Sequence, residues 1–179
     1  MSIFTNSASR SREEAAAYTS AILGLLGGRE PMAILKETPT ALRTLVAALS
    51  EEQTSTPEAT GKWSIRQVCQ HLADSELVWG WRMRLVLAHE RPAITGYDQD
   101  LWAARLDYAA VPVAQSLADF DALRAMNLRL LTGRRQEDLR RVGVHSERGE
   151  ESVAHMLNMY AGHDILHRRQ IERILQTLK

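Results

Sequence analysis

Two histidines and an aspartate interrupt an apolar helical stripe near the end of the chain, in the segment YAGHDILHRRQI over residues 160–171. On a wheel of 100° per residue, His163, Asp164 and His167 lie within about 60° of Tyr160, at the centre of that stripe. Side chains four residues apart are neighbours on a helix, so the two imidazoles can bind one metal ion. Imidazoles on an apolar face are costly unless their nitrogens have partners, and this location favours metal binding over two hydrogen-bonded core histidines.

A third ligand must come from another helix, and His71 is the best candidate. It lies about 100° from Leu72, on the flank of the apolar face of its helix, where it could reach a helix interface. Three neutral imidazoles leave a divalent ion its full charge and an open position, which is typical of catalytic rather than structural sites. All-nitrogen ligation suits zinc, nickel, iron or copper, of which we expect zinc or nickel.

Three carboxylates are candidates for catalytic work, and each has a structural alternative. Asp164, next to a metal ligand, could accept a hydrogen bond from a ring N–H elsewhere in the site. Glu76 lies inside an apolar arc, so it could orient a ligand or pair with an arginine of another helix. Asp98 precedes the segment QDLWAARL, where a helix N-cap is the favoured interpretation.

The remaining histidines and the single cysteine are weaker candidates. His89 ends its helix beside charged residues, His145 lies in a polar segment and His155 lies off the apolar arc, so we expect these three to face solvent. Cys69 is predicted to be a small buried hydrophobic residue, and it allows no intrachain disulfide. The sequence also lacks the Glu-x-x-His motif, the zinc-protease motif, the phosphate-binding glycine loop and the Gly-x-Ser-x-Gly elbow.

The composition of the 179-residue chain is that of one ordinary globular domain. Apolar residues make up 45%, and 22 Lys and Arg balance 22 Asp and Glu, so the net charge is zero. Nucleic-acid binding is disfavoured because it normally requires a basic excess. No apolar stretch resembles a signal peptide or approaches the roughly 20 residues of a membrane span, so we expect a cytoplasmic protein.

Glycine and proline divide the chain into segments with helical periodicity. A short helix, stopped by Gly27 and Gly28, is predicted over residues 12–27. Longer apolar patterns predict four further helices, over residues 31–49, 63–89, 113–132 and 152–177. Ser152 is the expected N-cap of the last helix. Four long amphipathic helices predict a four-helix bundle, with the short helix packed outside it.

The connecting segments lack the alternation of strands. Residues 50–62 are polar, residues 90–111 form a long crossover with a short helix around Trp102, and residues 142–150 are predicted to be a loop. We therefore expect an all-α fold without a sheet of three strands.

Two segments carry a resemblance to a known family. GKWSIRQVCQHLADSE (61–76) and YAGHDILHRRQIE (160–172) closely resemble the signature segments of the DinB/YfiT-like superfamily of metal-binding four-helix bundles. GYDQDLWAARLDY (96–108) and GVHSERGEESV (143–153) are similar to its YfiT-type branch. The resemblance implies a DinB-like bundle over residues 31–179, preceded by an extension with a short helix over residues 1–30.

The resemblance also implies a metal triad of His71, His163 and His167, and Gln170 matches the residue that usually follows the histidine pair. Some members transfer low-molecular-weight thiols to electrophiles, and others were named hydrolases from their metal site. The resemblance therefore favours a metal-dependent S-transferase that activates a thiol for attack on an electrophile. A hydrolase that uses a metal-bound water, and a non-enzymatic metal-binding or interaction module, are the alternatives.

Expectations about partners follow from the same resemblance and from the composition. The substrate is expected to be a small molecule, with a low-molecular-weight thiol as co-substrate, and neither nucleic acid nor membrane is an expected partner. A homodimer is expected because family members often pair through bundle faces. The apolar residues of the first helix also need covering, namely Ile22, Leu23, Leu25 and Leu26.

Overall fold

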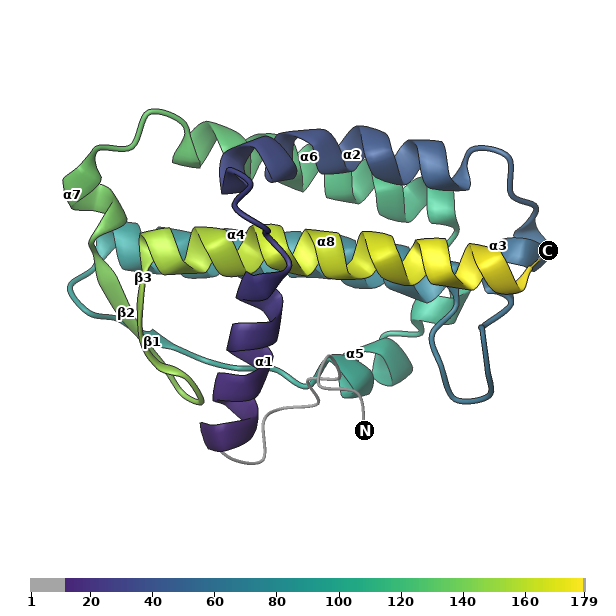
Figure 1. Ribbon diagram of the computed structural model, residues 1–179, viewed down its shortest axis with the longest axis horizontal. Helices are drawn as coiled ribbons and strands as arrows, with labels where there is room; N and C mark the ends of the chain where they lie inside the picture. The colour runs from purple at the N-terminus through teal and green to yellow at the C-terminus, as the bar shows by residue number, and fades with distance from the viewer. Residues whose placement is uncertain (1–11, 179) are drawn as a thin grey trace.

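Four long helices dominate the computed structural model, which describes residues 12–178 (Figure 1). They are α2 (Pro31–Val46), α4 (Ile65–Ala88), α6 (Val113–Leu131) and α8 (Val153–Thr177). The shorter elements are α1 (Arg12–Gly24), α3 (Glu51–Ser55), β1 (Ala93–Ile94), α5 (Gln99–Arg105), the 3-10 helix η1 (Tyr108–Ala110), α7 (Gln136–Leu139), β2 (Val142–His145) and β3 (Gly149–Ser152). The predicted four-helix bundle is confirmed, and no helix in the described part of the chain is long and apolar enough to cross a membrane.

The two helices that carry the histidines begin at side-chain caps. At the start of α4 the Ser64 hydroxyl accepts a hydrogen bond from the Gln67 N–H, and the Gln67 side chain accepts one from the Ser64 N–H. This reciprocal capping satisfies two donors that a helix start leaves without partners. Ser152 accepts from the His155 N–H at the start of α8, which confirms the N-cap predicted there.

The order of the helices forces a long crossover. α4 packs against α6 and α8, and α2 packs against the same two helices. Figure 1 shows that α4 and α6 run in the same direction, opposite to α2 and α8. Because neighbouring α4 and α6 are parallel, the chain must return along the whole bundle between them. β1, α5 and η1 lie on this return, and α5 is the short helix predicted around Trp102.

The expectation of a loop over residues 142–150, and of no three-stranded sheet, is wrong. β2 and β3 form an antiparallel hairpin, and β1 pairs with β2 in parallel, so the strand order is β1-β2-β3. In the parallel pair Ala93 is opposite Val144 and Ile94 is opposite His145. Strands this short show no periodicity of their own, and their pairing depends on a contact between the crossover and the hairpin. The polar connector over residues 50–62 likewise contains the short helix α3.

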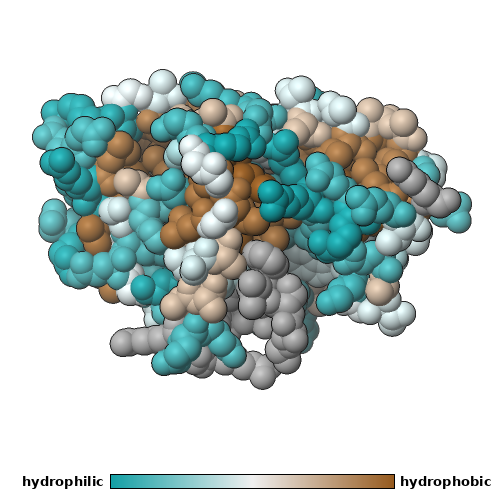
Figure 2. Space-filling view, viewed as in Figure 1, coloured by the Kyte–Doolittle hydropathy of each residue, from teal (hydrophilic) through white to brown (hydrophobic). Residues whose placement is uncertain are grey.

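Helix α1 crosses α8 outside the bundle (Figure 1). Ile22 and Leu26 are buried within the chain itself, and hydrophobic colour gathers near this junction on the face shown in Figure 2. The close approach of α1 to α8 depends on Gly162, where an added Cβ would lie 2.4 Å from the Ile22 carbonyl oxygen. Burial of Ile22 on α1, and of Leu26 just after it, within one chain means that a second copy is not needed to cover these two residues. The homodimer was expected partly because the apolar residues of the first helix need covering. It remains a prediction.

The bundle core consists of two hydrophobic clusters with a buried polar layer between them. One cluster includes Trp79, Met83 and Tyr160, and the other includes Leu72, Phe120 and Ile171. Along α4, α6 and α8, buried polar residues lie at or next to the boundary between the two clusters. These residues are Glu76, Arg124, Asn127, Asp164 and His167. A polar layer at this depth requires partners for its charges.

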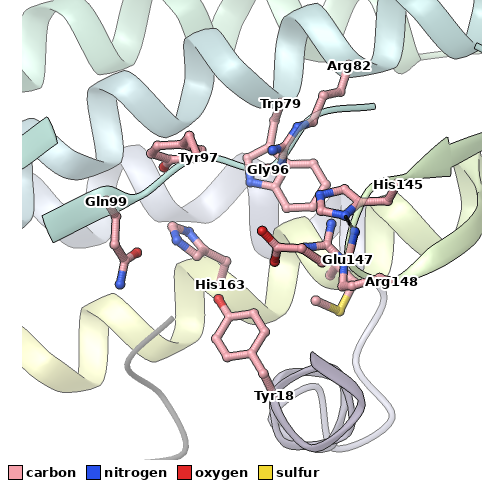
Figure 3. Close-up of a pocket in the computed structure, with 11 residues that line it drawn as sticks. Tyr18, Trp79, Arg82, Gly96, Tyr97, Gln99, His145, Glu147, Arg148 and His163 are labelled. Atoms are coloured by element: carbon pink, nitrogen blue, oxygen red, sulfur yellow. Dashed lines mark hydrogen bonds between the residues drawn. The ribbon is translucent and has the colours of Figure 1, made fainter. Parts of the chain in front are cut away.

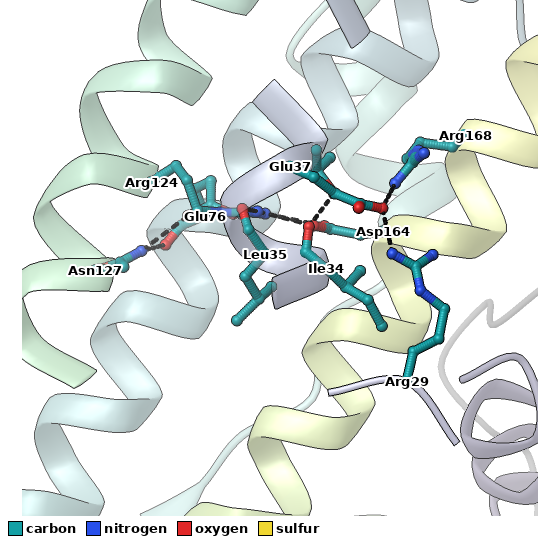
Figure 4. Close-up of polar contacts among 10 residues, drawn as sticks. Arg29, Ile34, Leu35, Glu37, Glu76, Arg124, Asn127, Asp164 and Arg168 are labelled. Atoms are coloured by element: carbon teal, nitrogen blue, oxygen red, sulfur yellow. Dashed lines mark hydrogen bonds and ion pairs between the residues drawn. The ribbon is translucent and has the colours of Figure 1, made fainter. Parts of the chain in front are cut away.

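Arg124 provides these partners (Figure 4). Its Nε and Nη2 donate to Glu76 Oε1 on α4 at 2.9 and 2.6 Å, and its Nη1 and Nη2 donate to the two carboxylate oxygens of Asp164 on α8 at 2.8 and 2.9 Å. Nη1 also donates to the Leu35 carbonyl oxygen on α2 at 2.6 Å. One side chain of α6 thus contacts each of the other three bundle helices.

We expect replacement of Arg124 by methionine to lower the free energy of unfolding by about 3–5 kcal/mol, because Glu76 and Asp164 would be buried without their cation. Urea denaturation followed by circular dichroism measures the change. Arg129→Met, on the exposed face of the same helix, is the matched control and should change stability by no more than about 0.5 kcal/mol. If both variants change the free energy of unfolding by equally small amounts, the network around Arg124 contributes little to stability.

Candidate metal centre

The structure brings the three predicted histidines together from two helices. His71 lies on α4, and His163 and His167 lie one turn apart on α8, with exposed fractions of 0%, 6% and 5%. The Nε2 atom of His163 is 3.1 Å from that of His71 and 3.2 Å from that of His167. The three rings therefore direct ligand atoms at one point, and these atoms all lie within 4.8 Å of one another.

This geometry fits one divalent ion. Two nitrogens that each bind a metal at about 2.0–2.1 Å are separated by about 2.8–3.4 Å for bond angles between octahedral and tetrahedral. The separations of 3.1 and 3.2 Å from His163 to the other two rings lie in this range. Without a cation, one N–H···N hydrogen bond can join only two of the three facing nitrogens at a time. A cation accepts the lone pairs of all three.

A hydrogen bond at Nδ1 orients one of the three rings. His167 Nδ1 is 2.8 Å from Gln170 Oε1, so Nδ1 carries the proton that is donated, and the Nε2 lone pair faces the common point. His71 packs against the Trp63 ring at a centroid distance of 4.9 Å. His71 Nδ1 and His163 Nδ1 are buried and have no hydrogen-bond partner among the described residues, so no hydrogen bond at Nδ1 orients these two rings.

The histidines are held in the neutral form that binds metals. Burial, and then the neighbouring Arg124, lowers the pKa of His163 to about 3. Burial, and then His163, lowers the pKa of His167 to about 3. Burial also lowers the pKa of His71 well below its usual range, with the other two rings adding to the effect. Near neutral pH all three rings therefore offer a lone pair.

The common point of the histidines has a polar neighbour, Ser75, and Tyr97 of the crossover lies beside it. Ser75 Oγ lies 3.4 Å from His71 Nε2 and 3.4 Å from the Tyr97 hydroxyl oxygen. Tyr97 and His163 also line a cavity of about 40 Å³ together with Arg82 and His145 (Figure 3). The crossover and the hairpin thus enclose a small space beside the histidines.

The structure places the three carboxylate candidates away from the ring nitrogens. Glu76 pairs with an arginine of another helix, which was one of its two expected roles. Asp164 was expected to accept from a histidine ring, but within the described residues its carboxylate accepts from Arg124 instead. Asp98 caps α5, where it accepts from the backbone N–H groups of residues 100 and 101. Catalytic roles for these carboxylates remain predictions that their contacts do not favour.

The expectation that His145 faces solvent is wrong. It lies at the end of β2 with an exposed fraction of 2%, because pairing with β1 covers it. His89 is exposed as expected, and His155 is half-buried beside Glu151. Cys69 is buried as expected, and burial raises the pKa of its thiol to about 12, so it is not a nucleophile at neutral pH.

Sequence reasoning missed several residues around the histidines, notably Ser75, Arg82 and Tyr97. Two of them carried a signal. Ser75 and Arg82 follow His71 by four and eleven residues, which places them within about 40° of it on the same helix face. Tyr97 had no such signal, because it reaches the site from an irregular part of the crossover.

The wild-type protein is expected to bind about one divalent ion, and alanine at His71, His163 or His167 should remove most of it. Helix content should persist because hydrophobic clusters lie on both sides of the site. Elemental analysis after equilibration with zinc, together with circular dichroism, measures both quantities. His155→Ala is the matched control and should keep the full equivalent. A full equivalent on the His71→Ala variant would exclude His71 as a ligand.

The metal-free protein is expected to lose stability as the pH falls below about 6.5. Burial, followed by Arg148 and Arg82, lowers the pKa of His145 from 6.5 to about 4, and the three clustered histidines are lowered as well. The unfolded chain therefore binds protons in this range that the folded chain does not. The contribution of these histidines to stability is fully present above their pKa in the unfolded chain. It declines as the pH falls toward their lower pKa values in the folded chain.

Urea denaturation of the metal-free protein at about pH 7.5 and about pH 5 tests this expectation, since most carboxylates keep their charge in that window. The His145→Asn variant should lose less stability over the same interval than the wild-type protein. Equal stability of the wild-type protein at both pH values would contradict the expected protonation states.

Comparisons with known proteins agree with this geometry. The chain is 34% identical over 129 residues to a protein of Oceanobacillus iheyensis named "Putative metal-dependent hydrolase", an alignment that covers 72% of this chain and 74% of the relative. A Bacillus licheniformis protein of the same name is 35% identical over 134 residues, covering 74% of this chain and 76% of the relative.

A solved structure is similar over most of the bundle. YfiT from Bacillus subtilis, described as "a probable metal-dependent hydrolase with an unusual four-helix bundle topology", superposes with a TM-score of 0.78 at 28% identity. The superposition covers 83% of this chain and 85% of that chain. The sequence profile of the DinB superfamily matches residues 34–171. Since this match includes α4, α6, most of α2 and α8, and the three histidines, the chain belongs to the DinB superfamily.

Proposed function

We propose that this protein is a metal-dependent hydrolase that acts on a small molecule, with zinc or nickel held by His71, His163 and His167. The observation that carries the proposal is the convergence of three buried, neutral imidazole nitrogens beside a cavity. Three uncharged ligands leave the ion its full charge and at least one open position. The names of the relatives and of the similar structure support hydrolysis.

When bound, the ion supplies Lewis-acid chemistry, since it lowers the pKa of a coordinated water to about 7 and polarises the bond to be cleaved. The protein supplies the surroundings. Trp63 covers His71 on one side, and Gln170 holds the ring of His167. These contacts keep the two rings in place.

Tyr97 is the hydrogen-bond donor that we assign to the reacting group of the substrate. Its hydroxyl lies beside Ser75 and lines the cavity next to His163. Burial raises the pKa of Tyr97, so the hydroxyl keeps its proton at neutral pH and can donate to an oxygen that gains negative charge. Ser75 orients this hydroxyl, because its own oxygen lies between the tyrosine and His71.

Hydrolysis and thiol transfer differ in what they consume, so one assay separates them. The family resemblance of the sequence favours thiol transfer, whereas the comparisons support the hydrolase alternative. A hydrolase needs only water as its second reactant. A transferase shows no turnover until a thiol is added.

The metal-free protein should be inactive, and reconstitution with zinc or nickel should restore hydrolysis of activated esters such as para-nitrophenyl acetate without any thiol. His163→Ala should abolish the activity, and Tyr97→Phe should lower kcat by about tenfold to a hundredfold, since it removes one donor to the developing charge. His155→Ala should leave the rate unchanged. Turnover that requires cysteine, with conjugation of chlorodinitrobenzene, would favour thiol transfer instead. Bound metal without either activity would favour a binding module.

A further inference from the structure

Among the described residues, Arg82 carries a buried charge without an ion-pair partner. Its exposed fraction is 6%, and Glu151 and Glu147 act on its charge through coulombic attraction without forming an ion pair with it. Nη2 donates to the Thr95 carbonyl oxygen at 2.6 Å, and the guanidinium lies over the rings of Trp79 and Tyr97 at 5.7 and 5.9 Å from their centroids. Buried arginines are normally paired, so this side chain has capacity for an anion.

His145 offers a second unused donor in the same cavity. The backbone N–H of Glu147 donates to its Nδ1 at 3.1 Å, so the proton of the neutral ring is on Nε2. Burial, and then the nearby arginines, lowers the pKa of His145 to about 4, so the ring is neutral near pH 7. Nε2 is buried and has no hydrogen-bond partner among the described residues. A buried N–H without an acceptor is rare unless a ligand supplies one.

The two donors line the same space as a metal-ligating ring. Figure 3 shows Arg82 from α4, His145 from β2 and His163 from α8 around one cavity. Its volume of about 40 Å³ has room for about three water-sized groups, which matches the carbon and two oxygens of a carboxylate. Among the described residues that line the cavity, the other charged ones are Arg148, which donates two hydrogen bonds to the Glu151 carboxylate, and the half-buried Glu147.

We propose that this cavity is a carboxylate subsite, in which Arg82 and the Nε2–H of His145 bind an anionic group of the molecule whose reacting bond lies at the three histidines. This inference rests on the proposed function for its second half, since it defines the substrate as a small carboxylic acid derivative with its reacting group next to His163. The carboxylate binding itself rests only on the two unused donors and the cavity.

A binding experiment tests the subsite without any turnover. Acetate is titrated into the metal-free protein at constant ionic strength, and the NMR signals of the His145 Nε2–H and the Arg82 Nε–H are followed. Acetate should shift both signals in a saturable way, and acetamide, its neutral isostere, should not. Arg82→Gln should weaken acetate binding by about tenfold to a hundredfold, which is the usual effect of a charge-assisted hydrogen bond.

Two further variants make the binding result specific. Arg84→Gln removes the same charge from the same helix, but Arg84 bonds the Gly80 carbonyl oxygen and Asn127 on another side, so acetate affinity should not change. Glu147→Gln removes negative charge from the cavity and should tighten acetate binding. Equal shifts with acetate and acetamide, or unchanged affinity in the Arg82→Gln variant, would overturn the subsite. Tighter binding of inorganic phosphate than of acetate would overturn its assignment to carboxylates.

An activity experiment tests the link to the metal centre. For the metal-loaded protein, Arg82→Gln should raise KM about tenfold or more for the mono-para-nitrophenyl ester of succinate, and it should leave KM for neutral para-nitrophenyl acetate unchanged. An equal change in KM for both esters would show that Arg82 does not bind the carboxylate of the substrate. If neither ester is hydrolysed, the proposed hydrolysis fails, while the acetate titration still decides whether the subsite exists.

Discussion

The ion network around Arg124 is the constraint on which the rest of the bundle depends. Its guanidinium contacts Glu76, Asp164 and the Leu35 carbonyl oxygen, so one side chain joins α6 to α4, α8 and α2. Burial raises the pKa of Glu76 even with the arginine beside it, which shows how strongly this layer is removed from water. A shift of any helix would leave a charge unpaired in the core, so the network fixes the register of all four.

The relative position of the helices determines where the three histidines of the candidate metal centre lie. Asp164 is held by Arg124, and its neighbour His163 lies on the adjacent side of α8, so the network sets the rotation of the helix that carries two of the three ligands. Beside the larger effect of burial, charges of the network act on the histidines in opposite directions, because Asp164 raises the pKa of His167 whereas Arg124 lowers the pKa of His163. The layer therefore orients the histidines, and burial keeps their rings neutral.

The crossover and the hairpin build the other half of the site. Because α4 and α6 are parallel neighbours, the connection between them runs along the bundle and brings Tyr97 to Ser75. Its strand β1 pairs with β2, which buries His145 next to Arg82. The ligands thus lie on rigid helices, while Tyr97 and His145 reach the cavity from the connecting segments and Arg82 reaches it from α4.

The sequence by itself determined the helices and the histidine pair. Apolar periodicity is a local property of a helix, and His163 and His167 are neighbours at four residues apart wherever α8 packs, so both could be predicted. The matching segments indicated the family, and His71 was proposed from its place beside the apolar face of its helix and was also implied by the resemblance. Partners distant in sequence could not be predicted in this way. Glu76 and Asp164 meet Arg124 across 48 and 40 residues, and His145 is buried through the pairing of β1 with β2. Only the tertiary structure decided these contacts, because they depend on which helix faces meet and not on the spacing along any one of them.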